Sequence, residues 1–485
     1  MTGLEYKWRV LSNTTVATLM SAIDTNIVLI SLPSIGRDLP GTSPTTLLWI
    51  LLGYSLLTAV VLLNFGRLSD LFGRVRLYIL GFAIFTFGSL LCGFSGTGIE
   101  LVAFRLVQAV GAGFLFSNSA AIITDAFPPN ERGRALGVNQ VSIVVGAVSG
   151  LILGGIITSE LSWRWIFFVN VPIGVVATVR AYYDLHELQR PTKAPRIDWI
   201  GNIVFALGLT LLLLGITLGA LGQLGDLPAA ATVVVGLALL GLFLWVESHE
   251  RSPMLDLKLF RIRQFATSAV SMLLNALARG AFTFILVFYL QGPPRYLNPF
   301  TAGVFLIPVS ASLATLGPVS GWLSDRYGPR PFLLAGLVTS AAGFLWLATI
   351  GSDESFLALA PPLILVGAGM GMFASPNRAA MMTAVPPTQR GVASGIGTTF
   401  VNTGATISLG LTLIIMTSVL SRSAITQIFL GTANAAQPFT AAAGFLAAIH
   451  LIFLISGVLC LVALVPSLYR PRPIATPAAA GEEAD

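Results

Sequence analysis

One acidic residue, Asp24, stands inside a long apolar stretch near the start of the chain. Thr14, Thr18, Ser21 and Ser31 recur around it at steps of three, four or seven, so a helix would place all five on one face. An acid deep in a membrane is costly and functional by default, and it could bind and release a proton cyclically. We expect a proton-binding residue on a cavity wall. The alternative is a structural hydrogen bond to a neighbouring helix.

Three arginines also fall within apolar stretches. Arg105 has Gln108 one helical turn away, so it could act as a partner that modulates protonation of Asp24 or form a packing hydrogen bond. Arg279 and Arg378 occur much later, with no acid inside the surrounding apolar stretches. A buried guanidinium needs a partner, so we expect Asp24, helix carbonyls or an anionic ligand. Snorkelling towards the surface is the alternative, mainly for Arg378.

Polar side chains within the apolar stretches are candidates to line a substrate cavity. Together with the two later arginines, we expect the following residues to face it: Asn26, Gln108, Asn118, Asn275, Gln291, Asn377 and Asn402. His450 is more often a hydrogen-bonded core histidine than a proton relay. One isolated acid and three scattered histidines supply neither a metal site nor a catalytic cluster. We therefore expect no cofactor and no enzyme activity, which disfavours a membrane-embedded enzyme.

The elements that must position these residues are membrane-spanning helices. Of the 485 residues, 55% are hydrophobic and 10% are charged, whereas about a quarter are charged in soluble domains. Apolar runs of about 20 residues must be helical, because lipid offers the backbone no hydrogen-bond partner. We expect fourteen spans, at about 9–33, 46–66, 76–96, 99–124, 134–158, 165–186, 197–220, 228–247, 263–291, 300–322, 331–351, 356–382, 391–420 and 441–465.

Loop charges orient these spans. With the first residue in the cytoplasm, 20 lysines and arginines lie on that side, four lie outside and three lie within spans. This asymmetry follows the positive-inside rule. We expect a multi-pass protein of a prokaryotic inner (plasma) membrane with both termini in the cytoplasm. The net charge of +6 reflects this topology and implies no nucleic-acid partner.

The chain also repeats itself. The run Gly66–Gly73 recurs at Gly321–Gly328 and the run Pro128–Gly137 at Pro386–Gly395, at offsets of 255 and 258 residues. Parallel six-span halves indicate alternating access around a site near the membrane midplane. The expected units are an N-terminal six-helix bundle at 1–190, a peripheral inserted two-helix hairpin at 191–250, a C-terminal six-helix bundle at 251–466 and a disordered cytoplasmic tail at 467–485.

The repeated loop after the second span is a candidate gate. We expect its residues and their copies to act in gating: Gly66, Asp70, Gly73, Arg74, Asp325 and Gly328. The glycines would permit a tight turn, and the first aspartate could cap a helix start or pair with the arginine. A positive-inside anchor is the alternative interpretation.

Several stretches resemble a known family. The repeated loop resembles the signature of the major facilitator superfamily. Three further stretches resemble motifs of its fourteen-span drug:proton antiporters: Asp24-Thr25-Asn26-Ile27-Val28 with Leu32-Pro33, Arg105-x-x-Gln108-x-x-Gly111-x-Gly113, and Trp163-Arg164-Trp165-Ile166-Phe167-x-x-Asn170-x-Pro172-x-Gly174. The resemblance implies an all-α major facilitator fold of two six-helix bundles plus two inserted helices.

One motif departs from that family. Its fifth-span motif has Gly-Pro shortly before a Gly-Gly pair, whereas Gly150 is followed here by Leu151, with Gly154 and Gly155 present. The resemblance implies a multidrug-type exporter that moves small amphiphilic organic molecules by proton antiport. We expect it to act as a monomer among membrane lipids. A flippase-like exporter of lipids or anionic amphiphiles is the alternative, favoured by the intramembrane arginines and the missing proline.

Overall fold

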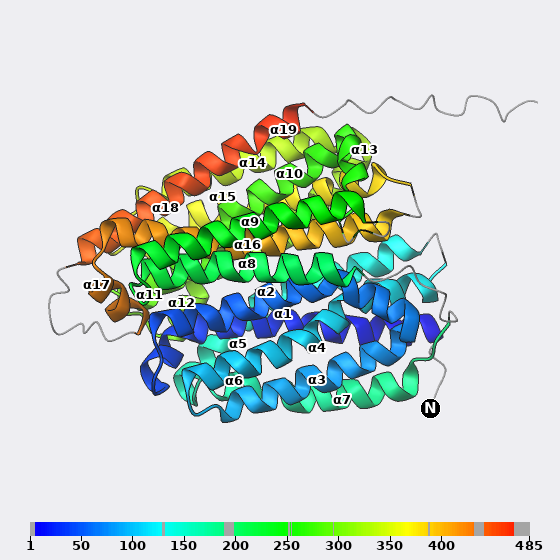
Figure 1. Cartoon of the computed structure of the whole chain (residues 1–485), viewed down its shortest axis with the longest axis horizontal. Coiled ribbons are helices and arrows are strands. Elements are labelled where there is room, and N and C mark those ends of the chain that lie inside the picture. Colours follow the sequence, from blue (N-terminus) through cyan, green and yellow to red (C-terminus); the bar gives the residue numbers. More distant parts are fainter. Residues whose placement is uncertain are drawn as a thin grey trace, which may run out of the picture.

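The structure is a computed structural model, and it describes residues 5–128, 131–188, 198–250, 253, 255–293, 295–386, 389–430 and 441–469. Within this part, all regular secondary structure is helical (Figure 1). Fourteen helical stretches, several of them made of two consecutive helices, are long and apolar enough to cross a membrane. The expected all-α fold with fourteen spans is therefore confirmed.

The first six spans are built from seven helices, because a break at Val169 divides the sixth span into α6 and α7. The helices are α1 (Tyr6–Asp38), α2 (Pro44–Phe72), α3 (Arg74–Phe94), α4 (Gly98–Ala126), α5 (Arg132–Glu160), α6 (Trp165–Phe168) and α7 (Asn170–Asp184). The inserted hairpin consists of α8 (Trp199–Ala220) and α9 (Asp226–His249).

The last six spans contain more breaks. Their elements are η1 (Leu257–Arg261), α10 (Arg263–Arg279), α11 (Phe282–Gln291), α12 (Pro299–Phe305), α13 (Ile307–Tyr327), α14 (Pro329–Leu347), α15 (Phe356–Thr383), α16 (Arg390–Val419), α17 (Arg422–Phe429), α18 (Ala442–Val462) and α19 (Leu464–Leu468). The expected tail at 467–485 begins too early, because α19 continues the last span to Leu468. Residues 470–485 lie outside the described part.

Short polar residues begin several of these helices. Ser43 accepts a hydrogen bond from the Thr46 amide at 3.1 Å, and Pro44 occupies the first turn of α2. Asn298 accepts one from the Thr301 amide at 2.7 Å at the start of α12. Such caps satisfy amides that have no partner within the helix, and the long apolar runs then carry the helices across lipid.

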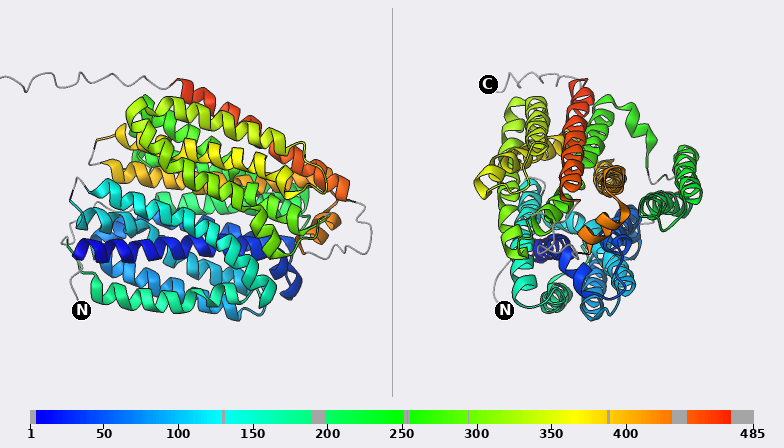
Figure 2. Two further views of the ribbon diagram at one scale, coloured as in Figure 1. Left: turned by 180° about the vertical axis from the view of Figure 1, so that it is seen from behind. Right: turned by 90° about the vertical axis from the view of Figure 1, so that its left-hand side faces the viewer.

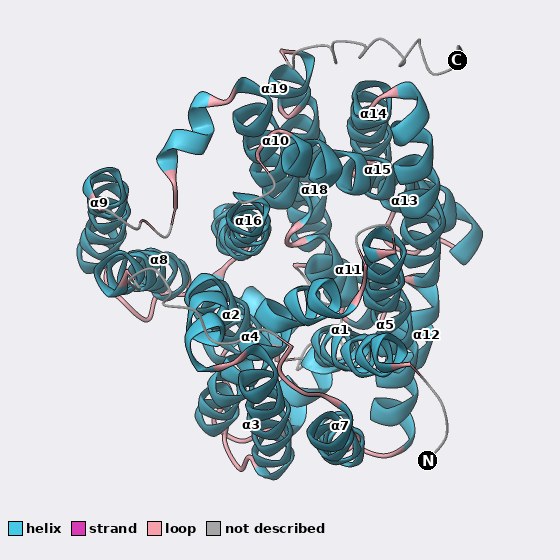
Figure 3. Cartoon of the chain, turned by 90° about the vertical axis from the view of Figure 1, so that its right-hand side faces the viewer, coloured by secondary structure: helices cyan, strands magenta, loops and turns pink. Residues whose placement is uncertain are grey.

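The inserted hairpin lies beside the two halves and packs through α8 against α2 and α16 (Figure 3). The Trp49 indole donates to the Thr217 hydroxyl at 3.2 Å, and the Asn202 amide donates to the Val60 carbonyl at 2.7 Å. The apolar side chains of α9 are largely exposed. These contacts place the hairpin at the periphery of the bundle.

The two halves pack closely at the end of the molecule opposite the N-terminus, where α11, α12 and α17 lie (Figure 1 and Figure 2). A Cβ atom on Gly155 would lie 2.7 Å from the Pro299 carbonyl oxygen, and one on Gly303 would lie 2.7 Å from the Leu151 carbonyl oxygen. Backbones approach this closely only where a side chain is missing. Towards the other end, a Cβ on Gly137 would meet no heavy atom within 4 Å among the described residues.

Candidate functional site

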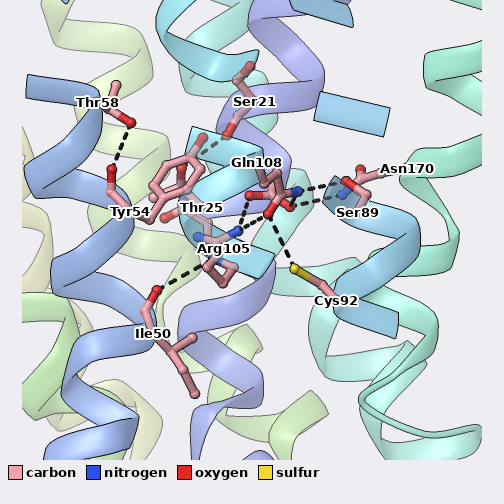
Figure 4. A network of polar contacts seen from close by, with 12 residues as sticks. Ser21, Thr25, Ile50, Tyr54, Thr58, Ser89, Cys92, Arg105, Gln108 and Asn170 are labelled. Atoms are coloured by element: carbon pink, nitrogen blue, oxygen red, sulfur yellow. Dashed lines mark hydrogen bonds and ion pairs between the residues drawn. The ribbon is translucent and has the colours of Figure 1, made fainter. Parts of the chain in front are cut away.

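Asp24 lies in the middle of α1 and is fully buried. Its Oδ2 accepts a hydrogen bond from Arg105 Nη1 at 2.6 Å. Its Oδ1 accepts two more, from Gln108 Nε2 at 2.8 Å and from Asn170 Nδ2 at 2.9 Å. Three donors from two other helices therefore converge on one carboxylate (Figure 4).

Arg105 on α4 is buried and held on several sides. Beyond Asp24, its Nη1 donates to Gln108 Oε1 at 2.6 Å, and its Nε lies 3.4 Å from the Ile50 carbonyl oxygen on α2. The guanidinium carbon lies 4.0 Å from the centre of the Tyr54 ring, a cation–π arrangement. The guanidinium thus has a counter-charge, two acceptors and an aromatic face.

Gln108 connects the ion pair to α3. Its Nε2 donates both to Asp24 and to the Ser89 hydroxyl, the latter at 2.7 Å. With its Oε1 accepting from Arg105, the amide holds both charged groups in position. The network joins α1, α2, α3, α4 and α7, all of the first half.

This arrangement is a buried ion pair with no net charge. Removing one partner of such a pair costs about 3–5 kcal/mol, because the other charge is left uncompensated. A proton bound to Asp24 would remove its charge and weaken the attraction to Arg105. The site can therefore couple proton binding to the contact between α1 and α4.

The polar face of α1 is packed. The Thr18 hydroxyl lies 3.1 Å from Asn139 Oδ1, and the Ser31 hydroxyl lies 2.7 Å from that of Thr158. Both partners belong to α5, and Thr14, Thr18, Ser21 and Ser31 are all buried. The expectation of a cavity wall is wrong for this face in this structure, because it serves helix packing.

Sequence reasoning did not select Asn170, Ser89 or Tyr54 as site residues. Asn170 was visible only as part of the Trp163–Gly174 motif, and the structure places it at the α6–α7 break, where it reaches Asp24. Ser89 and Tyr54 carry no signal beyond being polar groups in apolar stretches.

Most of the expected cavity amides donate to backbone instead. Asn26 donates to the Ala22 carbonyl, Asn118 to Phe114, Asn377 to Ser268 and Gln291 to Ile30, at 2.8–3.0 Å. The Gln291 bond crosses between the halves. Asn402 is half-buried on α16, and Asn275 is buried on α10. The lining role of these residues stays a prediction.

Arg279 and Arg378 are half-buried in the second half. In the part of the chain that the structure describes, neither makes a hydrogen bond or an ion pair. Asp24 pairs with Arg105 and not with Arg279, which answers one of the alternatives raised by the sequence. His450 is satisfied, since its Nε2 lies 2.7 Å from the Ile350 carbonyl oxygen.

The expected gate is shorter than the sequence indicated. The helix α2 continues to Phe72, so Gly66 is helical and only Gly73 makes the turn, with φ of +103°. Gly328 repeats this conformation with φ of +81°. Both oxygens of Asp125 accept from Arg74 at 2.8 Å. The side chains of Asp70 and Asp325 lie outside the described part.

Two related six-span halves around intramembrane charged groups define the class of helical membrane transporters with internal repeats. The chain belongs to the major facilitator superfamily, whose family model matches residues 14–409.

Curated relatives agree with this membership. The chain is 31% identical to the riboflavin transporter RibZ of Clostridioides difficile, over 80% of this chain and 83% of that protein. It is 32% identical to the multidrug resistance protein Stp of Mycobacterium tuberculosis, over 78% and 70%. It is 31% identical to the cephamycin export protein CmcT of Amycolatopsis lactamdurans, over 80% and 81%.

Solved structures share the fold. A bacterial homologue of the human lysosomal transporter Spinster matches with a TM-score of 0.68 and 16% identity, covering 96% of this chain and 97% of that chain. An auto-inhibited peptide transporter of the POT family matches with a TM-score of 0.66 and 17% identity, covering 98% and 99%.

Proposed function

We propose that this transporter exports small amphiphilic organic molecules in exchange for protons, by alternating access. The observation that carries the proposal is the complete burial of Asp24 beside Arg105, because an acid at such depth is functional by default. The relatives named for multidrug resistance and cephamycin export support the direction and the substrate class.

The proton acts on the contact between the halves through α1. When Asp24 binds a proton, its pair with Arg105 weakens, and Gln108 and Asn170 lose their charged acceptor. The same helix holds the second half six residues further on, where the Ile30 carbonyl accepts from Gln291. Proton binding at Asp24 thus loosens α1 near the seal, the closely packed contact between the halves at Gly155 and Gly303, and favours opening at that end.

The orientation follows from the loop charges. The end with both termini faces the cytoplasm of a prokaryotic cell, and the sealed end faces outward. The structure then represents an inward-facing state of a monomer in the inner membrane, with protons, lipids and an amphiphilic substrate as its partners. The paired turns at Gly73 and Gly328 lie at the cytoplasmic gate.

The decisive experiment is Asp24→Asn in proteoliposomes with an imposed pH gradient. The amide keeps the size of the side chain but cannot exchange a proton, so gradient-driven transport should fall to background. Asp38→Asn, at the exposed end of the same helix, is the matched control and should transport normally. Full gradient-driven activity in Asp24→Asn would refute proton coupling at this site.

A second candidate is the export of lipids or other anionic amphiphiles. It is favoured by one observation: among the described residues, neither Arg279 nor Arg378 pairs with an acid. Both candidates use the same proton site and differ in the charge of the cargo.

A further inference from the structure

Arg279 occupies the position in the second half that corresponds to Asp24 in the first. The offset of 255 residues that relates Gly66 to Gly321 also relates Asp24 to Arg279. The two spans correspond as well, since α1 begins at Tyr6 and α10 begins at Arg263. The repeat therefore places an acid in one half and a base in the other at matching depth.

The helix is interrupted where this arginine occurs. The helix α10 ends at Arg279, and α11 begins at Phe282. The Ala281 amide, freed by the break, donates to the Ser408 hydroxyl on α16 at 3.0 Å. Interrupted membrane helices are tolerated where neighbours satisfy the backbone, and they commonly mark binding sites.

The second half offers Arg279 few acids as counter-charges. From residue 263 to residue 468 the sequence has three acids, Asp325, Asp353 and Glu354, all at or near helix ends. Another arginine of this half, Arg378, lies on α15, and α15 packs against α10 through the hydrogen bond from Asn377 to the Ser268 carbonyl. Two half-buried like charges on packed helices are retained only if something compensates them.

A third donor belongs to the same face of α10. Asn275 precedes Arg279 by one turn, so the two side chains share a face. Asn275 is 5% exposed, and its Nδ2 has no hydrogen-bond partner among the described residues. In contrast, the three side chains that surround the Asp24 carboxylate, Arg105, Gln108 and Asn170, all donate to it.

We propose that Arg279, Arg378 and Asn275 form a binding site for the anionic head group of an amphiphilic ligand, a carboxylate, phosphate or sulfonate. The proposal rests on the export function proposed above and specifies the charge of its cargo. Two guanidinium groups offer forked donors that match such oxyanions, and the amide adds a further donor. The neutral Asp24–Arg105 pair leaves the acid of the first half already engaged, so it does not compete.

The test is a binding measurement on the purified full-length protein without a pH gradient. The probes are dodecyl phosphate, dodecyltrimethylammonium and inorganic phosphate, measured by titration calorimetry. Wild type should bind dodecyl phosphate, and bind the cation at least about tenfold more weakly, because a hydrogen bond to a charged group contributes that much. Inorganic phosphate should compete weakly, since it lacks the apolar tail.

Substitutions locate the site. Arg279→Ala and Arg378→Ala should each weaken dodecyl phosphate binding by about tenfold or more, and Arg279→Lys should recover part of it. Arg422→Ala, an exposed arginine elsewhere in the second half, is the control and should bind normally. Thermal unfolding of each variant identifies any that fails to fold. In that case the affinity of Arg279→Lys for dodecyl phosphate is the deciding measurement. Equal binding of anion and cation, or anion binding that is unchanged in both arginine variants, would overturn the proposal.

Two further arms separate the sources of the anion and the two proposals. Nanodiscs with phosphatidic acid in place of phosphatidylcholine should inhibit dodecyl phosphate binding if a lipid head group uses the site, and should have no effect if only free amphiphiles enter. Selective anion binding without proton-driven transport would leave this site standing and refute the proposed coupling. Proton-driven transport of neutral amphiphiles without anion binding would refute this site and leave the proposed proton coupling standing.

Discussion

At the scale of single residues, one carboxylate carries most of the chemistry of the first half. Asp24 is fully buried and accepts hydrogen bonds from three side chains of two other helices. A surface ion pair would be worth at most about 1 kcal/mol, too little to drive a change of shape. Loss of the buried pair with Arg105 should therefore destabilise the protein more than loss of a surface ion pair.

This ranking can be measured through stability. Arg105→Gln should destabilise the protein by about 3–5 kcal/mol, because it leaves the Asp24 charge uncompensated. Asn170→Ala should cost about 1–3 kcal/mol, since one of three donors is lost. Adding Asp24→Asn to Arg105→Gln should restore part of the loss. Apparent melting temperatures in one detergent supply the comparison.

Asn26→Ala is the matched control for Asn170→Ala, because Asn26 donates only to a carbonyl of its own helix. It should leave the melting temperature nearly unchanged. If the double variant with both charges removed melted no higher than Arg105→Gln, the two residues would not be energetically coupled.

At the scale of elements, breaks and turns position the functional groups. Asn170 begins α7 directly after a break, and Arg279 ends α10 at another. The turns at Gly73 and Gly328 both adopt positive φ with an extended ψ, a conformation that costs other residues about 1–3 kcal/mol. Next to Gly73, the Glu187 carboxylate accepts from the Val75 and Arg76 amides at 2.9 and 3.1 Å and caps α3.

Alanine at these turns should slow transport. A methyl group at Gly73 would be strained and would also displace Glu187, and Gly328→Ala should show a milder, parallel effect. Turnover in proteoliposomes should fall in both variants while substrate affinity stays constant, since neither turn lies near the proposed binding groups. Gly137→Ala, a helical glycine facing open space, should behave as wild type. Normal turnover in Gly73→Ala would leave the loop as an orientation anchor.

At the scale of the whole molecule, the two halves meet tightly at the end that holds α12 and α17. The closest approaches use glycines of α5 and α12, where a side chain would collide with backbone. A hydrophobic cluster from α1 and α2 continues across this end into α11, α16 and α17. The seal is therefore a packed interface, and opening it requires the two halves to move apart as rigid units.

A side chain placed in the seal should favour the other state. Gly155→Leu would push its side chain against the Pro299–Phe300 backbone, and the halves would separate at that end. Spin labels at Leu161→Cys and Leu357→Cys, both exposed at that end, should report a longer distance. Gly241→Leu, on the open face of the hairpin, should leave the distance unchanged. An unchanged distance in Gly155→Leu would exclude a rigid seal there.

The sequence alone determined the number of spans, their approximate ends and the position of the acid. These properties are local, because hydrocarbon thickness demands about 20 apolar residues whatever the neighbours are. The cost of burying a charge is local too, so Asp24, Arg105, Arg279 and Arg378 stood out without any structure. The repeat and the family resemblance then arranged the spans into two halves.

Only the tertiary structure decided which of these groups meet. Asp24 could have faced Arg105 or Arg279, and the packing of α1 against α4 selected Arg105. Helix packing also turns the face of α1 that carries Thr18 towards α5 instead of a cavity. The side chains of Asn118 and Asn377 donate to backbone carbonyls. Side-chain partners depend on how helix faces interlock, and that choice is made by the whole bundle at once, because no single helix carries enough information to fix its neighbour.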